Sequence, residues 1–443
     1  MKDIENSKKE SPMLGLTGLG GGVNSLMWAG AGVSKFDMYA WGLQTTDWPS
    51  PSPANHYGYL GLNQSFWYKD SPVQVPGDWY KMWNGGVMGN YANTVGGSKD
   101  EPGTLWVWGG NGAGNLGLNQ GPPANDNKRS SPTQVGTETN WENVSISRYT
   151  LGTKDDGSLW AWGINQYGEL GHNNKTSYSS PKQVGSDTTW SKDPFTLVSS
   201  APNAGQHSFA IKSDGTLWAW GSQTGGSFGQ NSNANTDYSS PRQIGTDTTW
   251  KSLANGSADM ALAIKTDGSL WAWGWGTSGG LGQNNRTQYS SPVQIPGTWK
   301  QAATGGRTWG TYGIKTDGTL WSWGYNFEGV LGLGYEPGWP GGWSARSSPN
   351  QIGTRTDWGL VDAGGGNGAS LKAITTDGNM FQWGNNLGGY SMGFGPAFGA
   401  TRISSPTQIA NINTKWGTGS AYDEDYAWSV ASTKGANFCL RQQ

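Results

Sequence analysis

The stretch Ala261–Trp273 reads ALAIKTDGSLWAW and places two short apolar segments on either side of Asp267-Gly268. An Asp-Gly pair between apolar segments is a strong hairpin signal, because a type I′ turn needs positive φ at both central residues. On the second segment, the leucine and alanine point to one side and the two tryptophans to the other. Both faces are therefore apolar, which predicts a small antiparallel sheet that is covered on both sides.

The same pattern recurs along the chain in seven units. Each unit has a Trp-Gly pair, then a Ser-Pro-x-Gln element, then one further tryptophan, always in that order. The Trp-Gly pairs begin at Trp41, Trp108, Trp162, Trp220, Trp273, Trp323 and Trp383. The further tryptophans are Trp79, Trp141, Trp190, Trp250, Trp299, Trp358 and Trp416. Small antiparallel sheets that repeat along a chain and are buried face to face are typical of a β-propeller.

We therefore expect an all-β fold, a seven-bladed β-propeller over residues 23–440, with a flexible or assembly-tethered leader at 1–22 and a tail at 441–443. Most of the 28 tryptophans are expected to pack between blades. Segments that resemble the second hairpin strand lie near both ends, at Met38–Trp41 and Asn437–Leu440. We expect these terminal strands to pair and close the ring, which removes exposed edges. The sequence leaves open which terminus supplies which strand.

The amino-acid composition argues against several classes of protein. The 29 Lys+Arg and 31 Asp+Glu residues give a net charge of −2, so we expect no binding to nucleic acid. Aromatic residues make up 12% of the chain, which is too many for a disordered protein. No apolar run approaches the roughly 18 residues of a membrane helix, so we expect no membrane insertion. The single cysteine, Cys439, excludes an intramolecular disulfide.

One unit carries a family resemblance. Leu159–Gly171, with the sequence LWAWGINQYGELG, resembles the signature of the regulator of chromosome condensation repeat. The resemblance implies a long-repeat propeller. The family's founding member is a nucleotide-exchange factor for a small GTPase on chromatin, and other members are interaction platforms. The charge-balanced N-terminal segment is not the basic arm of a chromatin binder, and no catalytic residue is carried over from the family.

A second resemblance concerns the leader. Met13–Gly22, with the sequence MLGLTGLGGG, is similar to short Gly/Leu starts on structural proteins of marine tailed bacteriophages. It implies a virion component that contacts other virion proteins, or a receptor or glycan on the host surface. The expected location is therefore the virion, with the cytoplasm as the alternative.

The chain has few candidates for catalytic or metal-binding residues. The three histidines, His56, His172 and His207, fall in different units, so we expect surface or loop positions. The aspartates of the Asp-Gly pairs are explained as turn formers. We predict no catalytic residue, no metal site and no cofactor, because no acid, base, nucleophile or set of ligands converges.

The units differ mainly in the connection between Trp-Gly and Ser-Pro, which is longest in the first and sixth units. Insertions in repeat proteins map to loops on one face, often the binding face. Aromatic residues beyond the needs of repeat packing suit a protein interface or a sugar-stacking surface, although they could also pack on their own blade. The candidates for contact with a partner or glycan are Trp48, Trp67, Tyr68, Tyr335, Trp339 and Trp343.

The main hypothesis is a non-enzymatic binding or structural propeller, as a bacteriophage tail, fibre or capsid-decoration protein. One alternative is a guanine-nucleotide exchange factor or another regulator of a small GTPase. A second alternative is a lectin-like propeller, in which several weak sites bind a carbohydrate with high avidity.

Overall fold

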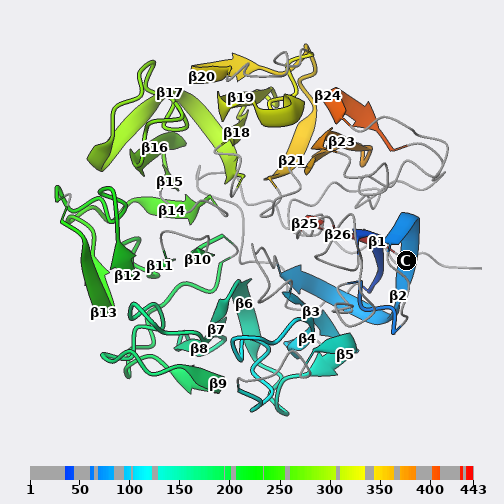
Figure 1. Cartoon of the computed structure of the whole chain (residues 1–443), viewed down its shortest axis with the longest axis vertical. Coiled ribbons are helices and arrows are strands. Elements are labelled where there is room, and N and C mark those ends of the chain that lie inside the picture. The colour runs from blue at the N-terminus through cyan, green and yellow to red at the C-terminus, as the bar shows by residue number, and fades with distance from the viewer. Residues whose placement is uncertain are drawn as a thin grey trace, which may run out of the picture.

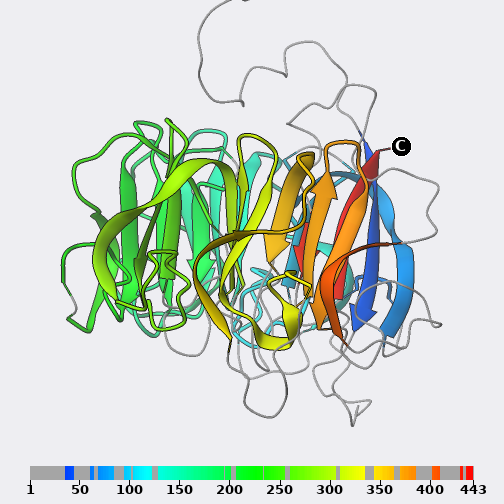
Figure 2. The same ribbon diagram turned by 90° about the horizontal axis from the view of Figure 1, so that it is seen from above.

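The strands of the protein lie around a ring in the computed structural model (Figure 1) and run between its two faces (Figure 2). The residues that the structure describes are 35–43, 60–63, 68–83, 94–100, 103–121, 128–193, 195–200, 206–232, 234–254, 260–305, 310–334, 344–363, 370–385, 402–409, 430–432 and 436–442.

The described residues form five antiparallel sheets. One seven-stranded sheet has the order β25 (Val430–Ser432), β26 (Ala436–Gln442), β1 (Phe36–Leu43), β2 (Tyr68–Trp83), β3 (Thr94–Lys99), β4 (Trp106–Gly109) and β5 (Arg129–Gln134). The other has the order β14 (Trp250–Leu253), β15 (Met260–Lys265), β16 (Ser269–Gly274), β17 (Tyr289–Thr304), β18 (Gly310–Lys315), β19 (Leu320–Tyr325) and β20 (Ala345–Gln351).

Three four-stranded sheets complete the ring of described strands, together with the short 3-10 helix η2 (Phe327–Gly329). The first has β6 (Trp141–Ile146), β7 (Tyr149–Lys154), β8 (Leu159–Gly163) and β9 (Tyr178–Gln183). The second has β10 (Leu197–Ser200), β11 (His207–Ile211), β12 (Leu217–Gln223) and β13 (Thr236–Gln243). The third has β21 (Trp358–Ala363), β22 (Ser370–Thr375), β23 (Met380–Asn385) and β24 (Arg402–Gln408).

This arrangement is the all-β propeller that the repeats predict, although the described strands form five sheets and not seven separate ones. The terminal strands pair as expected. β26 from the C-terminal end lies antiparallel to β1 from the N-terminal end, with Met38 opposite Leu440. β25 and β26 thus share one sheet with β1 and β2, so each end of the chain contributes two neighbouring strands there.

The Asp-Gly hairpins form, but their turn type differs from the prediction. In the hairpin of β15 and β16, the N–H of Gly268 donates to the carbonyl of Lys265 at 3.0 Å. Gly268 has φ +80°, whereas Asp267 keeps a negative φ. The turn is therefore a type I turn followed by a left-handed glycine, and the expected type I′ turn is wrong. The carboxylate of Asp267 explains this, because it accepts hydrogen bonds from the Ser269 N–H at 2.9 Å and hydroxyl at 2.6 Å.

The tryptophans of the Trp-Gly pairs hold neighbouring parts of the ring together. Trp162 on β8 is fully buried, and its Nε1–H donates to the carbonyl of Asn115, which lies in the connection between β4 and β5. The same bond from an indole to a carbonyl further back in the chain recurs around the ring, from Trp162 to Asn115 at 3.0 Å, Trp220 to Glu169 at 2.8 Å, Trp273 to Ser227 at 2.7 Å, Trp323 to Gly280 at 2.8 Å and Trp383 to Val330 at 2.7 Å. The predicted packing role of these tryptophans is confirmed.

A second contact repeats at the outer edge of the ring. The N–H of Asn173, a residue with φ +59°, donates to the carbonyl of Ser239 on β13 at 2.6 Å. Equivalent bonds join Asn63 to Ser130, Asn119 to Ser179, Asn231 to Ser290, Asn284 to Ser347 and Gly334 to Ser404. The proline that lies two residues after each of these serines has no N–H to offer, which helps to keep an outer strand from recruiting another chain.

A glycine with positive φ lies directly against each of these indoles: Gly117 against Trp162, Gly171 against Trp220, Gly229 against Trp273, Gly282 against Trp323 and Gly332 against Trp383. A Cβ on Gly117, which has φ +72°, would come within 2.6 Å of Trp162 Nε1. Real Cβ atoms essentially never approach a heavy atom this closely. Because the indole is fixed by its own hydrogen bond, it cannot move away without losing that bond.

We expect Gly117→Ala to destabilise the protein by roughly 2–4 kcal/mol, combining left-handed strain with displacement of Trp162. Gly185→Ala is the matched control, since Gly185 also has positive φ but nothing lies within 4 Å of its added Cβ. The control should lose only about 1–2 kcal/mol. Equilibrium denaturant unfolding measures both, and equal losses would contradict the proposed role of the indole contact.

Candidate functional site

Five of the six predicted contact residues, Trp48, Trp67, Tyr335, Trp339 and Trp343, lie outside the described residues. The sixth, Tyr68, begins β2, but its side chain is not among those described. The role of all six therefore stays a prediction.

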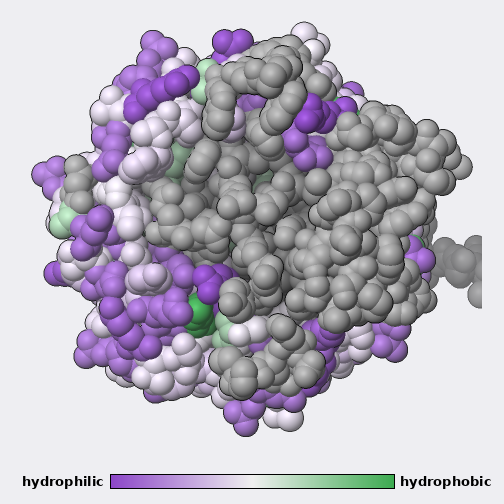
Figure 3. Space-filling view, in the orientation of Figure 1, coloured by the Kyte–Doolittle hydropathy of each residue, from purple (hydrophilic) through white to green (hydrophobic). Residues whose placement is uncertain are grey.

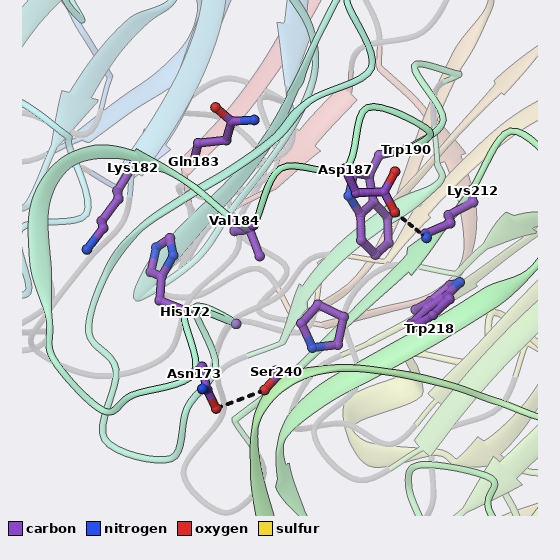
Figure 4. A pocket seen from close by; sticks show the side chains of 13 residues that line it. His172, Asn173, Lys182, Gln183, Val184, Asp187, Trp190, Lys212, Trp218 and Ser240 are labelled. Carbon is purple, nitrogen blue, oxygen red and sulfur yellow. Dashed lines mark hydrogen bonds and ion pairs between the residues drawn. The ribbon is translucent and has the colours of Figure 1, made fainter.

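The described part of the chain contains a groove between the sheet β6–β9 and the sheet β10–β13, with a volume of about 650 Å³ (Figure 4). The lining residues come from the segment before β9, the end of β9 and the connection that follows it, and from β12, β13 and the hairpin turn before β12. Its labelled side chains in Figure 4 are His172, Asn173, Lys182, Gln183, Val184, Asp187, Trp190, Lys212, Trp218 and Ser240.

A lysine held between two tryptophans forms the inner end of the groove. Trp190 and Trp218 meet edge to face at 6.0 Å, and Lys212 Nζ lies 5.0 and 4.3 Å from their ring centres. Lys212 also forms an ion pair with Asp187. Thr216 Oγ1 accepts the Nε1–H of Trp218 at 2.9 Å and so fixes the indole. The ion pair and the ring contacts hold Lys212 between the two indoles, although the Trp190 Nε1–H has no hydrogen-bond partner among the described residues.

The outer wall is more polar. Asn173 Oδ1 accepts a hydrogen bond from the Ser240 hydroxyl at 3.3 Å, and Lys182 Nζ donates to the Tyr178 hydroxyl at 2.8 Å. The His172 ring stands edge-on to Tyr178, 5.2 Å between centres, and burial lowers its pKa below the usual value. His172 is therefore neutral near pH 7. The wall offers hydrogen-bonding groups but no charged pair aimed into the groove.

The lysine cluster repeats with changes around the ring. Lys154 and Lys265 lie over tryptophan pairs in the same way, and their acid partners are Glu138 and Asp247. Lys315 stacks over Trp321 at 3.7 Å but forms no ion pair with a carboxylate among the described side chains. The repetition indicates that this cluster maintains the repeat and does not mark one specific site.

The sheet β21–β24 differs at both charged positions of this cluster. Thr375 stands where the other hairpins have lysine, and Arg355 stands where the preceding connection has an acid. The Arg355 guanidinium lies 5.7 Å from the Trp358 ring centre and 5.2 Å from that of Phe381. A cation thus still covers the aromatic pair, although it comes from a different segment of the chain.

Among the described residues, two large aromatic side chains are exposed on the opposite face of the ring from the hairpin turns. Tyr167 is 39% exposed in the connection between β8 and β9, and Trp275 is 40% exposed immediately after β16. Both connections precede an outer strand, as do the loops that carry the predicted contact residues. The sequence analysis did not select either residue, because both lie in connections of ordinary length.

The prediction of surface or loop histidines is wrong for His207. It begins β11 with 1% exposure, and its ring packs edge-to-face against Phe209 at 5.1 Å. Neither ring nitrogen has a hydrogen-bond partner among the described residues, and burial lowers the pKa to about 4. The apolar strand His207–Ile211 ahead of an Asp-Gly pair was the signal for a core position. His172 fits the loop prediction, and His56 lies outside the described residues.

The buried acid Glu169 is a feature that sequence reasoning missed. Its carboxylate accepts the Tyr167 N–H at 2.6 Å and the Gln166 N–H at 3.2 Å, while its carbonyl accepts the Trp220 indole. Burial nevertheless raises the pKa of Glu169 from 4.5 to about 7. The acid sits at the position that other units fill with tyrosine, asparagine, serine, glycine or valine, so the repeat does not require its charge.

No arrangement of metal ligands or catalytic groups emerges from the described residues. No three His, Cys, Asp or Glu side chains among them gather closely enough to hold a metal ion. In the same part of the chain, no helix has the length and apolar character needed to cross a bilayer.

Glu169→Gln tests the cost of the buried charge. The folded protein binds the proton of Glu169 more tightly than the unfolded chain does, so wild-type stability should fall as pH rises from about 4.5 to about 7. This shift corresponds to roughly 3 kcal/mol at most. The variant should lack this decrease and be more stable than wild type at pH 8. The measurement is the free energy of unfolding of both proteins in denaturant at pH 5 and pH 8. An identical pH dependence in both would contradict the raised pKa of Glu169.

Comparison with known proteins supports the repeat assignment. The model of the regulator of chromosome condensation (RCC1) repeat matches residues 156–211 and 267–308. The ultraviolet-B receptor UVR8 of Arabidopsis thaliana is 28% identical over 210 residues, which cover 46% of this chain and 44% of the receptor. The RCC1 domain-containing protein RUG3, mitochondrial, of the same plant is 25% identical over 369 residues, which cover 80% of this chain and 74% of that protein. The chain thus spans less than half of the receptor and about three quarters of RUG3.

Solved structures extend the fold over most of the chain. Prp20p from Saccharomyces cerevisiae superposes with a TM-score of 0.70 at 17% identity, covering 93% of this chain and 92% of that one. Human WBSCR16 superposes with a TM-score of 0.65 at 19% identity, covering 92% of this chain and 99% of that one. These similarities show the propeller fold, and residues 156–211 and 267–308 are similar to the RCC1 repeat.

Proposed function

We propose that the chain is a non-enzymatic propeller that binds another protein and regulates it. The observation that supports this proposal is the match to the RCC1 repeat, together with the similarity to a plant receptor and to the regulator of chromosome condensation of Xenopus laevis. The latter is 28% identical over 150 residues, 34% of each chain. Prp20p has binding properties toward Gsp1p and histones, so a propeller with this fold has protein partners.

We also propose that the ring has seven blades. β2 and β17 are 16 residues long, and each pairs with one strand along its first part and with another along its last part. Counting each as the last strand of one blade and the first strand of the next divides each seven-stranded sheet into two. The seven sequence units support this count.

The alternatives are not equally supported. The relatives named above favour a regulator, including the exchange-factor alternative, over a bacteriophage virion component, for which they give no support. The lectin alternative and the location in a virion or the cytoplasm stay predictions. The long connections with Trp48, Trp67, Tyr68, Tyr335, Trp339 and Trp343 remain proposed contact sites.

Photocrosslinking tests protein binding on both faces. A benzoylphenylalanine at Tyr167 or Thr287 would report the face of the outer-strand connections, and one at Lys251 would report the opposite face. In cells that encode the chain, we expect a discrete protein adduct from at least one face, identified by mass spectrometry. Melting curves would establish that each variant folds. The absence of adducts from both faces would contradict a protein-binding function.

Nucleotide release tests the exchange-factor alternative separately. Gsp1p is the probe, loaded with a fluorescent GDP and mixed with a small, catalytic amount of the chain. An exchange factor should accelerate release well above the intrinsic rate, because it turns over, and wild-type Prp20p is the comparison protein. Unchanged release would remove this alternative for Gsp1p and leave protein binding as such intact.

A further inference from the structure

The interface between one unit and the next has a repeated composition. In the unit of β14–β16, three side chains lie side by side on neighbouring strands, at Ala254 directly after β14, Leu262 on β15 and Ala272 on β16. They pack with the two repeat tryptophans of the following unit, Trp299 and Trp323. We call such a set the interface triplet of a unit.

Four other described units have an uncharged interface triplet at the same place. The triplets are Trp83 with Gly96 and Val107, Ser145 with Leu151 and Ala161, Val198 with Phe209 and Ala219, and Ala303 with Tyr312 and Ser322. Each of them also contributes to a core cluster with the two repeat tryptophans of the unit that follows. The same kind of face is therefore covered in the same way five times.

The sheet β21–β24 departs from this composition. Its interface triplet is Asp362, Lys372 and Gln382, which lie opposite one another across β21, β22 and β23. The side chains of Lys372 and Gln382 are completely buried, and that of Asp362 is 12% exposed. Lys372 Nζ lies 3.9 Å from Asp362 Oδ2. Polar side chains are ordinary on the outside of the ring, where hydrophilic residues predominate along the coloured rim in Figure 3, but a buried charged triplet is an exception.

The charged triplet faces the unit in which the two ends of the chain meet. Val361 and Leu371, the neighbours of the triplet on β21 and β22, pack with Tyr312 and Ile314 of the preceding unit. Because side chains alternate along a strand, the triplet lies on the other face of the sheet. β21 and β22 contact β25, which belongs to the sheet that β26 and β1 close (Figure 1). The triplet is thus covered by a unit that both chain ends build.

A buried charged pair restricts what can cover it. An ion in apolar surroundings is costly unless it is paired and hydrogen-bonded, and none of the three side chains is without a partner. Two repeat tryptophans from another unit would bury Lys372 and Asp362 without the partners that they have in the closed ring. An uncharged triplet makes no such distinction, because every unit presents similar tryptophans.

We propose that the charged triplet makes ring closure selective. It accepts the sheet that both ends of the same chain form, and it disfavours the repeat tryptophans of a second copy. Selection matters at this interface because β1 and β21 lie far apart in the sequence, so the face of β21–β24 is bare until both ends arrive. A second copy that covered it would make a head-to-tail contact, which need not close. The inference concerns assembly and is independent of what the ring binds.

The test gives β21–β23 the uncharged triplet of β14–β16, as Asp362→Ala with Lys372→Leu and Gln382→Ala. The reporter in every protein is Tyr39→Cys, which lies on β1 opposite Cys439 on β26, the one natural cysteine. After refolding over a range of protein concentrations and mild oxidation, the reporter protein should form its disulfide within one chain. The triple variant should raise the share of disulfides that join two chains by about tenfold or more, since the cost of a wrongly covered charge is removed. Non-reducing electrophoresis and light scattering measure this share.

Tyr312→Leu with Ser322→Ala is the matched control. It gives the neighbouring triplet the same composition of alanine, leucine and alanine, but the sheet that covers this triplet follows directly in the chain. The control should keep its disulfide within one chain, and melting curves should show which variants fold. An unchanged share of interchain disulfide in the triple variant, or an equal rise in the control, would overturn the inference.

A second variant covers the case in which the triple variant does not fold. Asp362→Asn with Lys372→Gln removes both charges and keeps polar side chains of similar size. It should raise the interchain share in the same direction, because the uncharged amides cost less to cover wrongly than ions do. An unchanged share in this variant, or interchain disulfides in the reporter protein itself, would also overturn the inference.

Discussion

The ring depends on one hydrogen bond that repeats between neighbouring sequence units, from a buried indole N–H to a backbone carbonyl in the connection that precedes an outer strand. A buried N–H without a partner is costly, so the carbonyl must be presented at a fixed place. The left-handed glycine beside each indole leaves room for the ring, as Gly117 does for Trp162. Each unit is thereby completed only by its neighbour, which explains why the sequence markers recur together.

Much of this could be predicted because it follows from local patterns. Alternating apolar residues around Asp267-Gly268 predict a hairpin, and apolar side chains on both faces predict that it is covered twice. The turn type could not be read from the pair alone, because the Asp267 carboxylate binds Ser269 and holds the aspartate at negative φ. The burial of His207 was missed for a different reason, since residue type was weighed above its place in an apolar strand.

The candidate surfaces were less predictable because they depend on contacts between units. Trp275 looks like one more repeat tryptophan in the sequence, and only its exposure and its contact with Gly225 separate it from the packing set. Arg355 and Thr375 show the converse. They look like departures from the pattern, yet Arg355 still places a cation over Trp358 and Phe381. A residue that departs from the repeat, such as Arg355, can thus preserve the packing of the unit. A residue that looks like part of the repeat, such as Trp275, can lie outside that packing.

A surface that recognises a partner is therefore expected at side chains that take no part in the packing between units. The lysine clusters on the hairpin side do not meet this condition, because Lys154, Lys212 and Lys265 are each held by two tryptophans and an acid. The connections to the outer strands do meet it. Their carbonyls anchor the next tryptophan, but their side chains are free to differ from unit to unit. Because the backbone there is fixed by packing, a side chain such as Trp275 is both variable and well positioned, which is the combination that a specific interface requires.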